Sequence, residues 1–218
     1  MLEWFEALIL GIVQGLTEFL PISSTAHVFI TSELFGWGDP GAAFSAVIQI
    51  GTEIAVLVYF RNDIKQVLQN LLRVLKEPAF RKTEEAKSSI GLVVGSLPIL
   101  VIGFLLRDVI ETDVRNLYLV SIMLILFGIV LINVEKYAKI REKQNLTIAS
   151  ALTIGISQAL ALVPGVSRSG ATISTGLALG YSREHSTRFA FLLAIPAVFA
   201  SGFFELRKGF SGGFQWGP

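Results

Sequence analysis

The sequence predicts an all-α, polytopic integral membrane protein with inverted-topology repeats, each containing a re-entrant broken helix. Three observations lead to this prediction. Hydrophobic residues make up 52% of the 218 residues and charged residues only 16%, whereas a soluble domain carries about 25% charged residues. The mean hydropathy is +0.64. Finally, two apolar segments interrupted by polar and helix-breaking residues, 7–34 and 148–182, resemble each other.

The composition also excludes several classes of function. The formal net charge is +1, so nothing points to a nucleic-acid partner. The chain has no Cys, which rules out disulfides, thiolate catalysis and Cys-ligated zinc. His27 and His185 are the two histidines, so a three-His metal site is excluded. The sequence therefore predicts a membrane protein with a small polar centre.

Four stretches approach the roughly 20 apolar residues that a membrane span needs. They are residues 41–60, 88–106, 116–134 and 189–204.

The connecting segments orient these spans. Seven Lys and Arg residues lie in 61–87 and four in 135–147, whereas 107–115 holds two basic and three acidic residues. The positive-inside rule places the first two segments in the cytoplasm and 107–115 outside. Within 61–87, apolar residues recur at helical spacing and predict an amphipathic helix. This helix lies either on the membrane surface or against the protein's own cytoplasmic face; its apolar residues are Val67, Leu68, Leu71, Leu72 and Leu75.

An internal repeat appears when the chain is shifted by 144 residues, which places residues 10–26 on 154–170. Five of the 17 positions are identical, where composition alone gives roughly one or two. Three predicted spans separate the copies, so the copies enter the membrane from opposite sides. Broken helices are tolerated in a membrane where they line a cavity, and their N-termini favour anions. Two similar apolar helices without a repeat are the alternative.

Gln14 and Glu18 are four residues apart and share one helix face. A carboxylate at membrane depth costs about 2.5–3.5 kcal/mol, so a divalent cation or Arg168 must compensate it. A purely structural ion pair is the alternative for Glu18. Glu53 also lies within a predicted span, and we expect it to be a packing or hydrogen-bonding partner rather than a catalytic group.

Pro21 breaks the first helix, and Ser23 and Ser24 suit the N-cap of a second one. Ser24 and His27 are three residues apart, so a hydroxyl and an imidazole can meet. That pairing is what an activated nucleophile needs.

The string PGVSRSGAT, residues 164–172, predicts a phosphate cradle. Its glycines let the backbone approach a ligand closely, and a helix start offers free N–H groups. Arg168 adds a planar fork that matches phosphate oxygens. A glycine-rich packing turn is the alternative, but it leaves the intramembrane arginine unexplained. The hydroxyls and the glycine that we assign to ligand binding are Ser167, Ser169, Thr172 and Gly165.

At these residues the chain resembles the undecaprenyl-diphosphate phosphatases, the bacitracin-resistance membrane phosphatases. The resemblance rests on QGLTEFLPISSTAH at 14–27 and PGVSRSGAT at 164–172, supported by IQIGTEIAVLVYF at 48–60 and FAFLLAIPA at 189–197. It implies hydrolysis of a long-chain polyprenyl diphosphate to the monophosphate and inorganic phosphate. That reaction recycles the lipid carrier of cell-wall glycan synthesis at the outer face of the cytoplasmic membrane, with a divalent cation, Mg²⁺ or Ca²⁺.

The resemblance assigns roles to single residues. Glu18, Ser24, His27 and Arg168 are the expected catalytic residues. Ser23 joins the substrate-binding set, and Glu18 with Gln14 holds the cation. Many family members carry Glu where this chain has Gln14, which weakens a two-carboxylate metal site. Two mechanisms stay open: Ser24 attacks with His27 as base, or His27 itself attacks or activates water.

The predicted organisation is a single transmembrane domain over 1–218, with repeat one at about 1–106 and repeat two at about 116–218. By comparison with the family, the C-terminal end looks incomplete. The expected partners are the polyprenyl diphosphate and membrane lipids, and a homodimer is left open. A lipid-phosphate transporter or flippase shares the inverted-repeat plan and is the rival function; a non-catalytic lipid-binding paralogue is a third.

Overall fold

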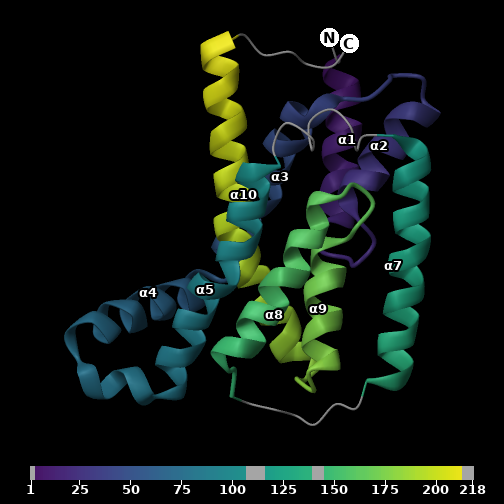
Figure 1. The fold of residues 1–218 in the computed structure, drawn as a ribbon. Coiled ribbons are helices and arrows are strands. Elements are labelled where there is room, and N and C mark those ends of the chain that lie inside the picture. Colours follow the sequence, from purple (N-terminus) through teal and green to yellow (C-terminus); the bar gives the residue numbers. More distant parts are fainter. Residues whose placement is uncertain (1–2, 107–115, 139–144, 213–218) are drawn as a thin grey trace.

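The computed structural model describes residues 3–106, 116–138 and 145–212, and these residues form an all-α protein (Figure 1). They contain nine α-helices and two short 3₁₀ helices, η1 (Pro78–Lys82) and η2 (Leu160–Leu162). The α-helices are α1 (Trp4–Thr17), α2 (Ser24–Leu34), α3 (Gly41–Tyr59), α4 (Arg61–Lys76), α5 (Glu84–Leu105), α7 (Leu117–Tyr137), α8 (Ile148–Ala159), α9 (Arg168–Ala178) and α10 (Arg183–Gly212).

Within the described residues, three helices are long and apolar enough to cross a membrane: α5, α7 and the Arg183–Phe204 part of α10. The pair Ala43–Tyr59 and Arg61–Lys76 is bent by 77° and brings the number of candidate spans among these residues to four when it is counted as one broken span. These helices cover the four predicted stretches, so a multi-pass membrane protein is confirmed. The predicted outer segment 107–115 and residues 139–144 of the second basic segment lie outside the described residues.

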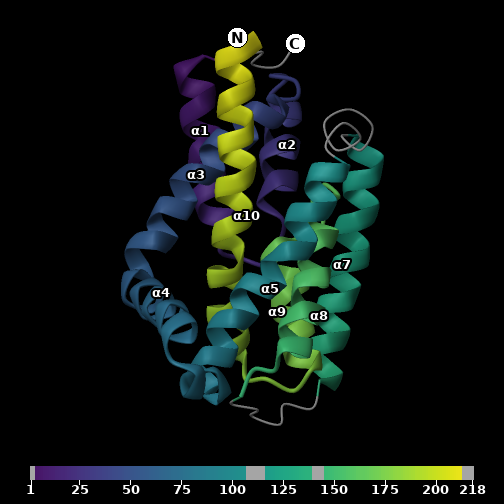
Figure 2. The ribbon, with the colours of Figure 1, turned by 60° about the vertical axis from the view of Figure 1, so that its left-hand side comes forward.

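The amphipathic helix α4 projects from the helical bundle in both views (Figures 1 and 2). One face packs against the core, where Val67 contacts a buried cluster and the Asn70 amide donates to Ser89 Oγ at 3.2 Å. The opposite stripe stays open, because Leu68, Leu72 and Leu75 are 57%, 56% and 74% exposed. The structure thus shows α4 packed on α5 with an apolar stripe uncovered. Contact of this stripe with the membrane surface stays a prediction.

The core consists of three buried apolar clusters. The largest joins α5, α8 and α10, the second joins α1, α2 and α3, and the third joins α2 to α7. Their buried members are Leu92, Leu146, Ala151, Ile154, Tyr181, Phe189 and Leu193; Leu10, Val28 and Phe44; and Ala26, Phe29 and Val120.

Helices α5 and α8 approach each other backbone to backbone. A Cβ built on Gly155 of α8 would lie 2.0 Å from the carbonyl oxygen of Gly95 on α5. No side chain fits in that space, so glycine is required at residue 155 for this contact. The contact fixes the helix that leads into the second of the two chain breaks described below.

Two broken hairpins, α1–α2 and α8–α9, share the same internal register. Adding 144 to the bounds of α2, 24–34, gives 168–178, which are the bounds of α9. The same shift moves the start of α1 at Trp4 onto the start of α8 at Ile148. The correspondence seen in residue identities therefore extends to helix boundaries.

Candidate active site

The break in the first hairpin brings Glu18 and Ser24 together. Glu18 directly follows α1, and its N–H donates to the Gln14 carbonyl at 2.9 Å. Ser23, at the N-cap of α2, has φ = +66° and is the one non-glycine residue with positive φ among the described residues. This conformation is rare for a residue with a side chain. It turns the chain so that the Ser24 hydroxyl, at the start of α2, points back at Glu18.

The break in the second hairpin brings Arg168 to the start of α9. Gly165 has φ = +96°, and a Cβ on it would lie 2.6 Å from the Val120 carbonyl oxygen of α7. This glycine therefore allows the loop to pack against α7. Ser167 then caps α9, because its Oγ accepts a hydrogen bond from the Gly170 N–H at 3.0 Å.

The two breaks meet inside the protein. The Arg168 guanidinium donates to Glu18 Oε1 across 150 residues of sequence. The Ser169 hydroxyl donates to the Leu20 carbonyl at 3.2 Å. The side chains of Arg168 and Glu18 are only 18% and 10% exposed, so each charge offsets the cost of placing the other at this depth.

Glu18 is the centre of the polar network. Its Oε2 accepts from Gln14 Nε2 at 2.8 Å and from the Ser24 hydroxyl, while Oε1 accepts from Arg168. A hydroxyl that donates to a buried carboxylate has a base in place to take its proton. Such an arrangement can serve as a nucleophile beside a base, with a guanidinium on the same carboxylate.

A cavity of about 440 Å³ opens from this network. Its polar wall comes from both breaks and from α3: Glu18, Ser23, Ser24, Thr25, Ser45, Gln49, Ser167, Arg168 and Ser169. Its apolar wall comes mainly from the C-terminal halves of α5 and α10: Ile99, Leu100, Gly103, Phe104, Ala197, Ala200 and Phe204. Such a cavity suits a ligand with one charged end and one apolar end.

Six of the predicted site residues line this cavity: Glu18, Ser23, Ser24, Ser167, Arg168 and Ser169. The other four have different surroundings. Gln14 is buried behind Glu18. Gly165 serves the packing on α7 described above. The Thr172 hydroxyl donates to the Arg168 carbonyl at 2.9 Å, which helps hold the first turn of α9.

His27 does not meet Ser24 in this structure. The imidazole Nδ1 lies 2.9 Å from the Ser23 carbonyl oxygen, and because a carbonyl only accepts, Nδ1 is the donor. The Ser24 hydroxyl is engaged by Glu18 instead. Ser23 occupies the predicted N-cap, but its side chain makes no capping hydrogen bond.

The structure also places residues near the site that the motifs did not include. Gln49 and Ser45 of α3 line the main cavity, and Gln49 Nε2 donates to Thr25 Oγ1 at 3.4 Å. Glu53, one turn further along α3, is 2% exposed and faces Glu18 and Arg168 across a smaller cavity. The signal that could have found Glu53 is the cost of an acidic residue within a predicted span.

The side chains around Glu18 supply some of the ligands that an oxygen-preferring cation needs. Among the described residues, no three His, Cys, Asp or Glu side chains are placed together so that they could hold a metal ion. Glu18 and Gln14 offer a carboxylate and an amide oxygen. Mg²⁺ commonly uses one or two carboxylates and fills its remaining positions with water and substrate phosphate. The residues are compatible with such a cation.

The fold and the site together define a class: a multi-pass membrane protein with a buried polar site, built from two broken hairpins, at one end of an apolar cavity. A family model described as bacitracin resistance protein BacA matches residues 7–215. The chain belongs to this family.

Curated relatives align with this chain over its whole length. The chain is 51% identical to an undecaprenyl-diphosphatase of Nocardioides sp., with 100% of this chain and 81% of the relative covered. It is 50% identical to undecaprenyl-diphosphatase 2 of Streptomyces avermitilis and 48% identical to an undecaprenyl-diphosphatase of Streptomyces griseus. Each of these two alignments covers 100% of this chain and 79% of the relative.

Proposed function

We propose that the chain hydrolyses undecaprenyl diphosphate to undecaprenyl monophosphate and inorganic phosphate, and so recycles the lipid carrier and confers bacitracin resistance. The observation that carries the proposal is the Glu18 carboxylate, which accepts from both the Ser24 hydroxyl and the Arg168 guanidinium at the polar end of an apolar cavity. The names of the relatives point to the same reaction.

The two ends of the substrate, one charged and one apolar, determine how it binds in the cavity. The diphosphate binds at Arg168, whose fork matches phosphate oxygens, with the hydroxyls of Ser167 and Ser169 beside it. Thr172 and Gly165 act indirectly in this scheme. They fix the start of α9 and the loop before it. The first isoprene units follow the apolar wall from α5 and α10.

The reaction begins with attack of Ser24 Oγ on the terminal phosphorus. The Ser24 proton passes to Glu18, the Oγ–P bond forms, and the bond from phosphorus to the bridging oxygen breaks. Undecaprenyl monophosphate leaves with that oxygen, which takes the proton from Glu18 and returns Glu18 to the carboxylate form. Glu18 then takes a proton from water, the water oxygen attacks the phosphoserine, the Oγ–P bond breaks with release of inorganic phosphate, and Glu18 returns the proton to Ser24 Oγ. Arg168 stabilises the charge on the transferring group, as expected for phosphoryl transfer.

His27 has a supporting role in this scheme. Its imidazole donates a hydrogen bond to the Ser23 carbonyl. It therefore stabilises the turn that directs the Ser24 hydroxyl toward Glu18. The second mechanism, in which His27 attacks or activates water, requires the ring to leave this carbonyl and turn into the cavity.

A divalent cation, Mg²⁺ or Ca²⁺, bound with Glu18 and Gln14 would neutralise charge on the diphosphate. This chain's own residues hold that carboxylate in place: Gln14 and Ser24 donate to one oxygen and Arg168 to the other.

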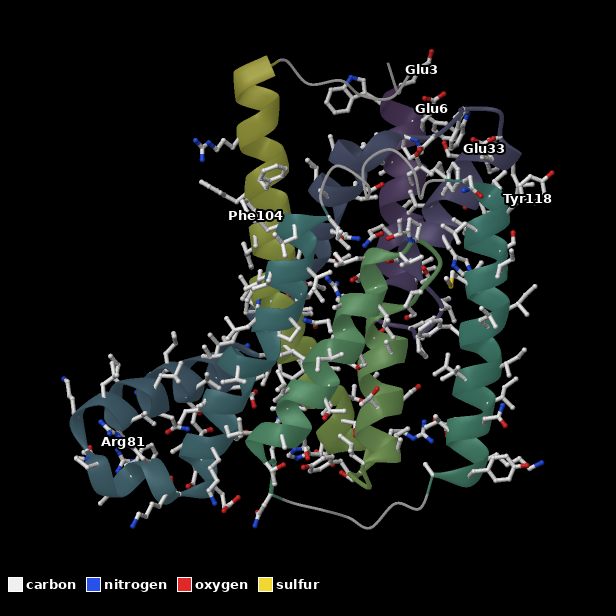
Figure 3. All side chains as sticks on the ribbon, in the orientation of Figure 1. Glu3, Glu6, Glu33, Arg81, Phe104 and Tyr118 are labelled. Carbon is white, nitrogen blue, oxygen red and sulfur yellow. The ribbon has the colours of Figure 1, made fainter. Side chains whose placement is uncertain are left out.

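The proposed setting is the cytoplasmic membrane, with the site open to its outer face. Glu3, Glu6 and Glu33 lie at one end of the molecule and the basic segment with Arg81 lies toward the other (Figure 3). The cavity is lined by the C-terminal halves of α5 and α10, away from the basic end where α5 begins. By the positive-inside rule, the basic end is cytoplasmic.

An inverted-topology repeat accounts for the matching hairpins. In Figure 1, α1 starts at the end where the N-terminus lies and α8 starts at the opposite end, which supports two re-entrant hairpins of opposite direction within one domain. A homodimer remains a prediction, to be checked by the mass of the detergent-solubilised particle.

Release of inorganic phosphate tests the proposal against its rival. Purified protein in detergent with Mg²⁺ should convert undecaprenyl diphosphate to equal amounts of monophosphate and phosphate. A transporter or flippase would instead move the intact lipid across proteoliposomes without releasing phosphate. Lipid movement without phosphate release would reject the proposal.

A further inference from the structure

Glu53 is a buried acidic residue that the reaction scheme does not use. It lies in α3, it is 2% exposed, and its Oε1 has no hydrogen-bond partner. A buried carboxylate oxygen without a partner is costly, and the cost is greater within a membrane-spanning segment. A bound proton or a bound cation would lower the cost of burying this side chain.

The smaller cavity beside Glu53 has a polar side and an apolar side. It measures about 10 Å³, roughly the space of one water-sized species. Its lining residues with side-chain oxygens are Glu53, Glu18 and Ser169, and its apolar lining comes from α1–α2, α3 and α10: Phe19, Val56, Ala190, Phe191 and Ala194. Arg168 also borders this space, but its guanidinium is already paired with Glu18.

Two carboxylates around a space of this size favour a cation over an organic ligand. Carboxylate and hydroxyl oxygens are the ligands that Mg²⁺ and Ca²⁺ prefer. Paired carboxylates with one formal positive charge from Arg168 leave a net charge of −1, which a divalent cation would compensate. Glu18 also borders the main cavity, so an ion here would sit next to the phosphate-binding end.

We propose that Glu53 is the second carboxylate of a divalent-cation site shared with Glu18. The inference deepens the proposed function and rests on it. With Glu53 as a ligand, the site has a second carboxylate although residue 14 is a neutral Gln. The sequence predicts a packing or hydrogen-bonding partner at Glu53, whereas its unpartnered oxygen and its place opposite Glu18 argue for a ligand role.

The test is direct binding of Mn²⁺ to the purified chain in detergent, without substrate, followed by electron paramagnetic resonance. The wild type should bind Mn²⁺ at a site from which Mg²⁺ and Ca²⁺ displace it. Glu53→Gln should weaken binding at least about tenfold, and Glu53→Asp should bind with intermediate affinity. Glu33→Gln removes an exposed carboxylate from α2 and should bind like the wild type.

A wild type that binds no Mn²⁺, or a Glu53→Gln variant that binds it unchanged, would overturn the inference. Because a variant can fail to fold, the wild type is also treated with a hydrophobic carbodiimide and Glu53 modification is measured by mass spectrometry. Mg²⁺ should protect Glu53, and the absence of any Mg²⁺-dependent difference would count against the site. Phosphate release without cation binding would reject this inference alone, and cation binding without phosphate release would reject the proposed function alone.

Discussion

Arg168 and Glu18 are paired where the breaks of two helical hairpins meet. Under the shift of 144 residues, Glu18 corresponds to Leu162, and Ser24 corresponds to Arg168. Each hairpin therefore supplies what the other lacks: the first carries the carboxylate and the hydroxyl, and the second carries the guanidinium. Neither hairpin forms the site alone.

Arg168→Ala and Arg168→Lys should both lower kcat/KM at least about 100-fold, because loss of one preorganised donor typically costs 10²–10³ in rate. The lysine retains the charge that pairs with Glu18 but loses the planar fork. Phosphate release is the measurement, with melting temperature in detergent as the folding control. If the lysine variant keeps most of the activity, charge alone suffices and the bidentate role is wrong.

Glu18→Gln should lower kcat at least about 100-fold, since general-base catalysis contributes about 10²–10⁴. The amide keeps the shape of the side chain but cannot take the Ser24 proton, and it leaves Arg168 without its counter-charge. Removing one partner of a buried pair costs about 3–5 kcal/mol, so the melting temperature should also fall. Glu33→Gln, on the exposed face of α2, should change neither quantity. An active Glu18→Gln variant would exclude Glu18 as the base.

Much of the fold could be predicted from sequence. Apolar stretches located the spans, and the 144-residue shift located two breaks whose helix bounds coincide. Local spacing could not predict the site's contacts. Ser24 and His27 are close in sequence, yet Ser24 turns to Glu18 because the left-handed backbone at Ser23 redirects the chain.

Long-range packing explains the other differences. Gly165 was expected to face a ligand, but α7 occupies the space beside it. Glu53 was expected to be a packing or hydrogen-bonding partner, because it lies within a predicted span beside Gln49, Gly51 and Thr52. Only the fold brings it opposite Glu18. In both cases the deciding partner comes from a helix far away in sequence.

Gly155→Ala should destabilise the protein by about 1–3 kcal/mol, the usual cost of overpacking, because its Cβ would collide with the Gly95 carbonyl. Gly11 is its counterpart in the first hairpin, and nothing lies within 4 Å of a Cβ built there. Gly11→Ala should be neutral or stabilising, since Ala favours a helix interior by about 0.5–1 kcal/mol over Gly. Thermal unfolding in detergent compares the two variants, and equal melting temperatures would contradict the close α5–α8 contact.

The basic segment should face the cytoplasm. Because the chain has no Cys, Lys82→Cys provides a single thiol in η1. An impermeant maleimide should leave it unlabelled in intact cells and should label it after the cells are opened. Labelling from outside would reverse the orientation and place the cavity toward the cytoplasm.

Trapping of the phosphoenzyme tests whether Ser24, activated by Glu18, attacks the phosphorus that Arg168 holds. Undecaprenyl diphosphate labelled in the terminal phosphate is mixed with the enzyme, quenched with acid within milliseconds and analysed by peptide mass spectrometry. We expect label on Ser24 in the wild type and in His27→Ala, and none in Ser24→Ala, which should also release no phosphate. Label on His27, or near-wild-type turnover by Ser24→Ala, would contradict it.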